Sequence, residues 1–166
     1  EQQYRRARGR PRFPTVPVTG ESGHQRAGRP AERRGRRLLR ALLDVNVLIA
    51  LLDSDHLHHG RATAWLQENI HSGWASCPLT ENGCIRIMSQ TGYPNPRPAG
   101  AIAERLAAAT ATGHHVFWSD AVSILDRGRI AWNAVLGSRQ VTDVHLLALA
   151  EQQGGRLVTL DRAVPL

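Results

Sequence analysis

Four acidic side chains lie where short apolar segments give way to loops or helices: Asp44, Glu81, Asp143 and Asp161. In an open parallel α/β sheet, ligands bind outside the carboxyl ends of the strands, where side chains from neighbouring strands converge. Two carboxylates 4 Å apart repel each other by about 4 kcal/mol at an effective dielectric constant near 20. A cluster of such acids therefore takes up protons or binds a cation.

A bound cation would make this cluster a hydrolytic site. Oxygen ligands favour Mg²⁺ or Mn²⁺, and such an ion can activate a water molecule and stabilise the leaving oxygen of a phosphodiester. Each acid alone is also an ordinary turn or capping residue. The spacing of the four acids is compatible both with a metal site and with separate turn or capping roles, and it does not decide between them.

The apolar pattern predicts the elements that would position these acids. The predicted strands lie in "ALL" before Asp44, "GWASCP", "HHVFWSD" (114–120) and "RLVTL". Helical spacing is found in a segment from about Asn46 to Leu52 and in "HHGRATAWLQENIHSG", "LTENGCIRIMSQ", "AGAIAERLAAATATG" and "VTDVHLLALAEQQGG". We expect Thr142 to cap the last of these helices and Gly154 and Gly155 to end it. Short apolar strands that alternate with helices predict a three-layer α/β/α domain with a central parallel sheet.

Charge is distributed unevenly along the 166 residues. Residues 1–40 contain 12 of the 21 Lys+Arg and 3 of the 14 Asp+Glu, whereas residues 41–166 carry a net charge of −2. Residues 1–37 are rich in Arg, Gly and Pro without apolar periodicity, which predicts a disordered tail before a folded domain at 38–166. This basic tail suggests an alternative function, that of a nucleic-acid-binding module without catalysis.

Several other classes of protein are disfavoured. Every basic residue is Arg, so enzymes that place a lysine beside a phosphoryl group do not fit. Cys77 and Cys84 are too few for a disulfide framework and suit a reducing, cytoplasmic location. No apolar stretch approaches the roughly 20 residues of a membrane span, and residues 1–37 contain no apolar core of a signal peptide.

Four segments resemble, in order, the motifs of PIN-domain ribonucleases: "LLDVNVLIALLDSDHLHH", "CPLTENGCIRI", "RQVTDVHLLALA" and "RLVTLD". The most similar group is the VapC toxins of type II toxin–antitoxin pairs, and the resemblance covers residues 41–166. It implies a PIN-like fold and a Mg²⁺- or Mn²⁺-dependent endoribonuclease that cleaves RNA. It also implies inhibition by a VapB-type antitoxin and assembly as a homodimer.

The resemblance also assigns site residues. The predicted catalytic residues and metal ligands, which match the family's acidic quartet, are Asp44, Glu81, Asp143 and Asp161. Asn46 matches a small polar position that could orient the site or a metal-bound water. Asp120 is the alternative to Asp161, because the last acid varies in position across the family. Apart from the resemblance, three arginines are candidates for phosphate contact: Arg86, Arg97 and Arg139. We expect His145 to pack or cap, and Trp132 is the one tryptophan that is a candidate for an exposed position.

Overall fold

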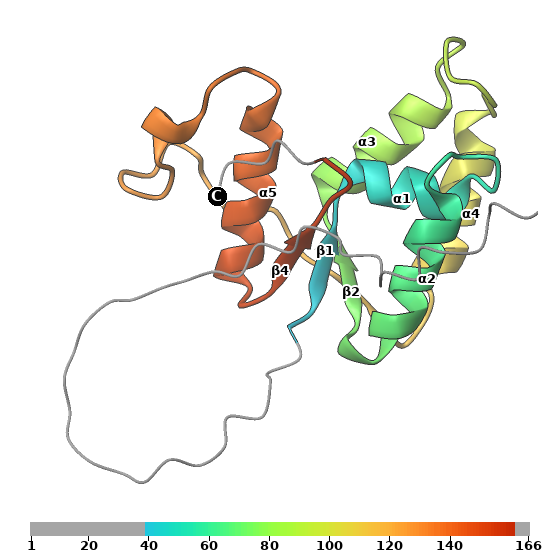
Figure 1. Ribbon diagram of the computed structural model, residues 1–166, viewed down its shortest axis with the longest axis horizontal. Coiled ribbons are helices and arrows are strands. Elements are labelled where there is room, and N and C mark those ends of the chain that lie inside the picture. The colour runs from blue at the N-terminus through green and yellow to red at the C-terminus, as the bar shows by residue number, and fades with distance from the viewer. Residues whose placement is uncertain (1–38, 162–166) are drawn as a thin grey trace, which may run out of the picture.

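Four short parallel strands form one sheet in the order β3-β2-β1-β4. The computed structural model describes residues 39–161 (Figure 1). The strands are β1 (Ala41–Leu43), β2 (Trp74–Ser76), β3 (His115–Phe117) and β4 (Arg156–Val158). Leu42 pairs with Ala75 of β2 and with Leu157 of β4, so β1 is central. Both faces of β1 are buried, as expected for a central strand of a parallel sheet.

Helices cover both faces of the sheet, which confirms the predicted three-layer α/β/α architecture. Figure 1 shows α1 (Val45–Leu52), α2 (His59–Asn69), α3 (Pro78–Met88) and α4 (Ala99–Thr110) on one side, and α5 (Gln140–Gln152) on the other. Two short 3₁₀ helices lie between these elements, η1 (Ile70–Ser72) and η2 (Trp132–Ala134).

Alternate residues of β1, β2 and β4 contribute to two separate apolar cores. Leu43 and Trp74 face the four-helix layer, where they pack with Val47, Leu48, Trp65 and Cys84. Leu42 and Ala75 face α5, where they pack with Trp118, Leu146, Leu149 and Leu157. Three tryptophans are thus core residues, as expected, and Trp132 is 47% exposed.

The start of α5 differs from the sequence-based expectation. The helix begins at Gln140, and Arg139 occupies the N-cap position without a side-chain cap. Thr142 is therefore the third helical residue and is exposed, so the prediction that it caps the helix is wrong. Gln140 and Val141 precede Thr142 in the helix, and the Gln140 side chain accepts a hydrogen bond from the Leu136 N–H at 2.7 Å. The predicted end is confirmed, because Gly154 has φ 61°.

Parallel strands bring their carboxyl ends to the same edge, and this edge carries the predicted acids. Asp44 follows β1, Asp161 lies just beyond β4, and Glu81 and Asp143 lie in the first turns of α3 and α5. The predicted tail, 1–37, lies outside the described residues. None of the described helices is both long and apolar enough to cross a bilayer.

Candidate active site

Asp44 is fixed by three hydrogen bonds at the junction of β1 and α1. The Val45 N–H donates to Oδ1 at 2.6 Å, and Asn46 Nδ2 and Thr159 Oγ1 donate to Oδ2 at 2.7 and 2.6 Å. The residue is 5% exposed. Burial raises the pKa of Asp44, the hydrogen bonds oppose this shift, and the charge of Asp161 adds to it. The carboxylate is therefore well oriented but electrostatically disfavoured.

Asn46 and Thr159 connect this carboxylate to the end of β4. Thr159 Oγ1 accepts hydrogen bonds from Asn46 Nδ2 and from the Asp161 N–H, each at 3.0 Å. Asn46 Oδ1 accepts the Leu160 N–H at 2.9 Å. Asn46 therefore holds the strand ends of β1 and β4 together. Thr159 was not a predicted site residue, and its only sequence signal is its position two residues before Asp161.

Asp143 has an even less favourable environment. It is 9% exposed, and no described residue donates a hydrogen bond to its carboxylate. Burial, followed by the charges of Asp44 and Asp161, raises the pKa of Asp143 to about 6. Asp44, Asp143 and Asp161 thus form one electrostatic group, although they come from three different elements. We call these residues the acidic triad.

A cleft of about 340 Å³ opens beside two members of the triad. Asp44, Asn46 and Asp143 line this space together with residues of α3. We call this space the α3 cleft. The residues of α3 that line it include Leu79, Asn82, Gly83 and Arg86. Their spacing of three and four places them on one side of the helix.

Gly83 allows α3 to approach the start of α1. A Cβ atom at Gly83 would lie 2.7 Å from Cγ2 of Val45, the residue that follows Asp44. Any larger residue would therefore push the two helices apart, at a typical overpacking cost of about 1–3 kcal/mol. The close approach fixes how far the α3 side chains stand from Asp44.

Glu81 is turned toward the sheet rather than into the α3 cleft. Ser76 Oγ donates to Glu81 Oε1 at 2.6 Å and lies 2.8 Å from His115 Nε2. Burial lowers the pKa of His115, and the charge of Glu81 opposes that shift. In the described conformation, the predicted quartet is therefore divided into the acidic triad and a separate Glu81.

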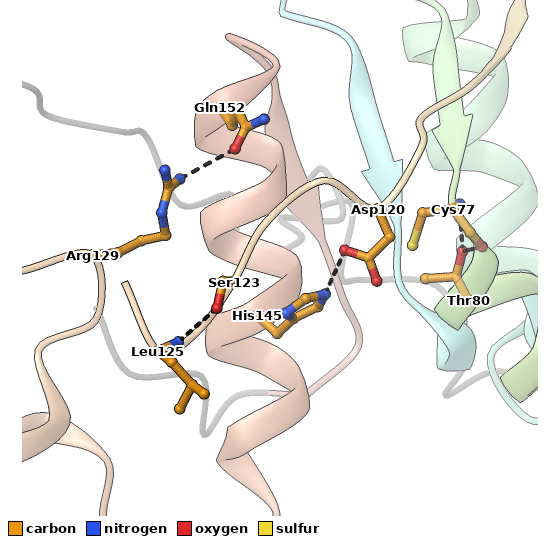
Figure 2. Close-up of polar contacts among 8 residues, drawn as sticks. All are labelled: Cys77, Thr80, Asp120, Ser123, Leu125, Arg129, His145 and Gln152. Atoms are coloured by element: carbon orange, nitrogen blue, oxygen red, sulfur yellow. Dashed lines mark hydrogen bonds and ion pairs between the residues drawn. The ribbon is translucent and has the colours of Figure 1, made fainter. Parts of the chain in front are cut away.

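Asp120, the alternative fourth acid, is engaged elsewhere. His145 Nε2 lies 2.9 Å from Asp120 Oδ1, and the pair links the loop after β3 to α5 (Figure 2). The His145 side chain is 14% exposed, which agrees with its expected packing role. The charge of Asp161 raises the pKa of both Asp44 and Asp143. The geometry thus favours Asp161 over Asp120 as a partner of the other two acids.

The chemistry of the triad fits a hard divalent cation. Its donors are carboxylate oxygens, and burial together with the charges of the neighbouring acids raises the pKa of Asp44 and of Asp143. Within residues 39–161, no three Asp, Glu, His or Cys side chains already surround one point closely enough to hold an ion. Mg²⁺ commonly retains several waters and binds one or two carboxylates together with substrate phosphates. A complete protein cage is therefore not required.

Comparison with known proteins agrees with this architecture. The family model described as "PIN domain" matches residues 41–165. Ribonuclease VapC44 of Mycobacterium tuberculosis H37Rv is 51% identical over 128 residues, which cover 77% of this chain and 90% of the relative. Ribonuclease VapC39 of the same strain is 47% identical over 126 residues, which cover 75% of this chain and 90% of the relative.

A solved structure is also similar. The crystal structure of Mycobacterium tuberculosis VapC20, described as a sarcin-ricin loop cleaving toxin, matches with a TM-score of 0.51 and 13% sequence identity. The match covers 69% of this chain and 84% of the VapC20 chain. At this identity, the likeness supports the fold alone.

Proposed function

The chain belongs to the PIN-domain family and, within it, to the VapC-type ribonuclease toxins, and from this premise we propose that it is a metal-dependent endoribonuclease. The observation that carries the proposal is the position of Asp143. A carboxylate with a pKa raised to about 6 lies in a cleft beside Asp44 and feels the charge of Asp161. Such an arrangement costs free energy in the folded protein unless a cation or proton neutralises it.

The acidic triad would hold Mg²⁺ or Mn²⁺. Asn46 and Thr159 keep the Asp44 carboxylate in one orientation, and Asp143 approaches it from the first turn of α5. A divalent cation there would supply a nucleophilic water and charge stabilisation for the leaving oxygen. Glu81 belongs to the proposed set because it matches the family position and neighbours Asn82, which lines the cleft.

RNA cleavage with and without metal tests this proposal. We expect the purified full chain to cut total RNA in the presence of Mg²⁺ or Mn²⁺ and to stop when EDTA is added. The variant Asp44→Asn, which removes one ligand charge with little change in shape, should be inactive while its circular dichroism spectrum matches that of the parent. Cleavage that resists EDTA, or undiminished cleavage by folded Asp44→Asn, would contradict the proposal.

The family premise also supports a protein partner. We propose that a VapB-type antitoxin inhibits this chain, and that an antitoxin arginine enters the acidic cleft in competition with the metal. Expression of this chain alone should arrest bacterial growth, and co-expression of the small protein encoded beside it should restore growth. Normal growth despite folded protein at confirmed high levels would count against the toxin function. The expected homodimer is open to measurement by sedimentation.

The alternative function assigns all activity to the basic tail. Deletion of residues 1–37 separates the two proposals, because the triad and both cores lie within 39–161. A nuclease should keep its fold and cleavage, although its RNA binding should depend less steeply on salt. A binding module should lose its function. A truncated chain that failed to fold would show that the proposed boundary is wrong.

A further inference from the structure

The α3 cleft has a feature that the acidic triad does not use. Of the residues that line it, Arg86 alone is positively charged, and it shares the cleft with Asp44 and Asp143. We propose that Arg86 binds a phosphate of the RNA strand, with Asn82 as a neutral neighbour, and so positions the strand over the triad. This proposal rests on the proposed function, and it makes Arg86 a positioning residue rather than a metal ligand.

The helix geometry places Arg86 at the cleft. Gly83 lies against Val45, and Arg86 is three residues further along α3, about 4.5 Å along the helix axis. Asn82 is one turn before Arg86 on the same side of the helix. The close packing at Gly83 therefore fixes the guanidinium-bearing turn of α3 near the N-terminus of α1, which begins immediately after Asp44.

The guanidinium group of Arg86 is available for a ligand. It forms neither a hydrogen bond nor an ion pair with any residue of the described chain, although Asp44 and Asp143 line the same cleft. The Asp44 carboxylate is instead satisfied by Val45, Asn46 and Thr159. A guanidinium offers five N–H donors in a planar arrangement that matches phosphate oxygens.

The two other arginines that the sequence suggested for phosphate binding lie elsewhere. Arg97 lines a different pocket, near Asp53 and Arg105, and Arg139 occupies the N-cap position of α5. Neither lines the α3 cleft. The choice of Arg86 therefore comes from the structure, since all three residues are exposed in a similar way and the sequence alone does not separate them.

The charges of the cleft also suggest a reason for a positively charged side chain at Arg86. An RNA strand brings negative phosphates toward carboxylates that already disfavour their own ionisation. A positive side chain in the same cleft attracts the strand and offsets this repulsion. A bound metal would neutralise the triad, and Arg86 would hold a neighbouring phosphate of the same strand.

Full-length Arg86→Gln, Arg86→Lys and Arg127→Gln provide the test. Arg127 is an exposed arginine outside the cleft, so its variant is the matched control for charge. In cleavage assays, we expect Arg86→Gln to raise KM roughly tenfold, the loss of one charge-assisted hydrogen bond, with kcat changed little. Arg86→Lys should recover part of the loss, and Arg127→Gln should match the parent.

A second readout does not depend on cleavage. Fluorescence anisotropy of a labelled single-stranded RNA, measured over a range of salt concentrations with each variant in the Asp44→Asn background, reports the number of phosphate contacts. The slope of log K against log salt should fall by about 0.7 for Arg86→Gln and stay unchanged for Arg127→Gln. The basic tail is present in every variant, so its contribution cancels in the comparison.

The two proposals fail in different ways. A parent chain that cuts no RNA would refute the proposed function, and the salt slopes would still decide the role of Arg86. If KM and slope were the same in Arg86→Gln and Arg127→Gln, Arg86 would be an ordinary surface arginine and the inference would be wrong. A lower melting temperature of Arg86→Gln together with an unchanged slope would also overturn it, because this would indicate a structural role.

Discussion

The two ends of α1 each carry a buried aspartate, and their environments are opposite. Asp44 precedes the helix and is 5% exposed, and Asp53 follows it and is 9% exposed. Burial raises the pKa of Asp44. Hydrogen bonding lowers the pKa of Asp53, principally through the Tyr93 hydroxyl, which donates to Oδ2 at 2.6 Å. Two aspartates with similarly small exposed fractions thus shift in opposite directions.

The balance between burial and hydrogen bonding accounts for the difference: burial outweighs the hydrogen bonds at Asp44, and the hydrogen bonds outweigh burial at Asp53. Three groups donate hydrogen bonds to the Asp53 carboxylate: the Tyr93 hydroxyl, the Asp55 N–H at 3.1 Å, and the Asn95 amide, which also donates to Asp55. Around Asp44, two further acids contribute to the same group. Asp53 is arranged so that its ionised form stabilises the fold. The acidic triad is arranged at a cost in stability, which is common at functional sites.

Catalysis should show the largest difference between the two ends of the helix. Asp44→Asn is expected to reduce RNA cleavage by roughly 10³-fold or more, a scale seen when a member of a catalytic unit is removed. Asp53→Asn, an equally conservative change nine residues later, should retain cleavage within about threefold once its folded fraction is corrected for, since Asp53 lies outside the α3 cleft. Initial rates on one RNA substrate measure both values, and equal losses would contradict the distinction.

Thermodynamic stability should depend more on the Asp53 end of α1 than on the Asp44 end. Tyr93→Phe removes a hydrogen bond to a charged carboxylate and should lower the free energy of unfolding by about 1–2 kcal/mol at neutral pH. The pKa of Asp53 is lowered in the folded protein, so this contribution is present above the ordinary value of 3.8 and is lost as the pH falls through the folded value. Urea unfolding of the two proteins from pH 7 to pH 3 should show converging stabilities, and a constant difference would be inconsistent with this cause.

Without metal, the acidic triad should lower the free energy of unfolding, so removing the Asp143 charge should stabilise the protein, by less than the Tyr93 change destabilises it. The pKa of Asp143 is raised to about 6, so its ionisation weakens the folded state above that pH, and the penalty disappears as the pH falls toward 3.8. In EDTA, Asp143→Asn should be more stable than the parent by about 1 kcal/mol at pH 7.5, once solvent screening is allowed for, and equal to it near pH 4. Urea unfolding measures this gain, and a variant less stable than the parent at pH 7.5 would be contrary to expectation.

The fold could be predicted from the sequence because the signals for its strands and helices are local. "ALL", "WAS" and "RLV" are short, mostly apolar segments bounded by residues that end strands, which is how short buried parallel strands appear in a sequence. The cap of α5 was misplaced because Thr142 is a good capping residue by type. The helix starts earlier, where Gln140 bonds to Leu136 in the preceding turn, a contact that residue preferences do not reveal.

The candidate site could be predicted only in part, because the directions of some side chains depend on contacts between segments that are distant in the sequence. Strand ends located Asp44, and the start of a helix located Asp143, because backbone position alone sets where these residues lie. The direction of the Glu81 side chain depends on Ser76 and His115, and the latter is 34 residues away along the chain. Thr159 and Arg86 become site residues only through packing between distant segments. Such contacts leave little trace in the spacing of residue types.

Thermal unfolding with and without divalent metal tests the central claim, that the acidic triad forms a cation site. The parent and Asp53→Asn should each gain several degrees in melting temperature when Mn²⁺ or Mg²⁺ replaces EDTA, because a ligand that binds only the folded state stabilises it. Asp44→Asn should gain much less, since it lacks one ligand charge. An equal gain in all three proteins, or no gain in the parent at millimolar metal, would contradict the claim.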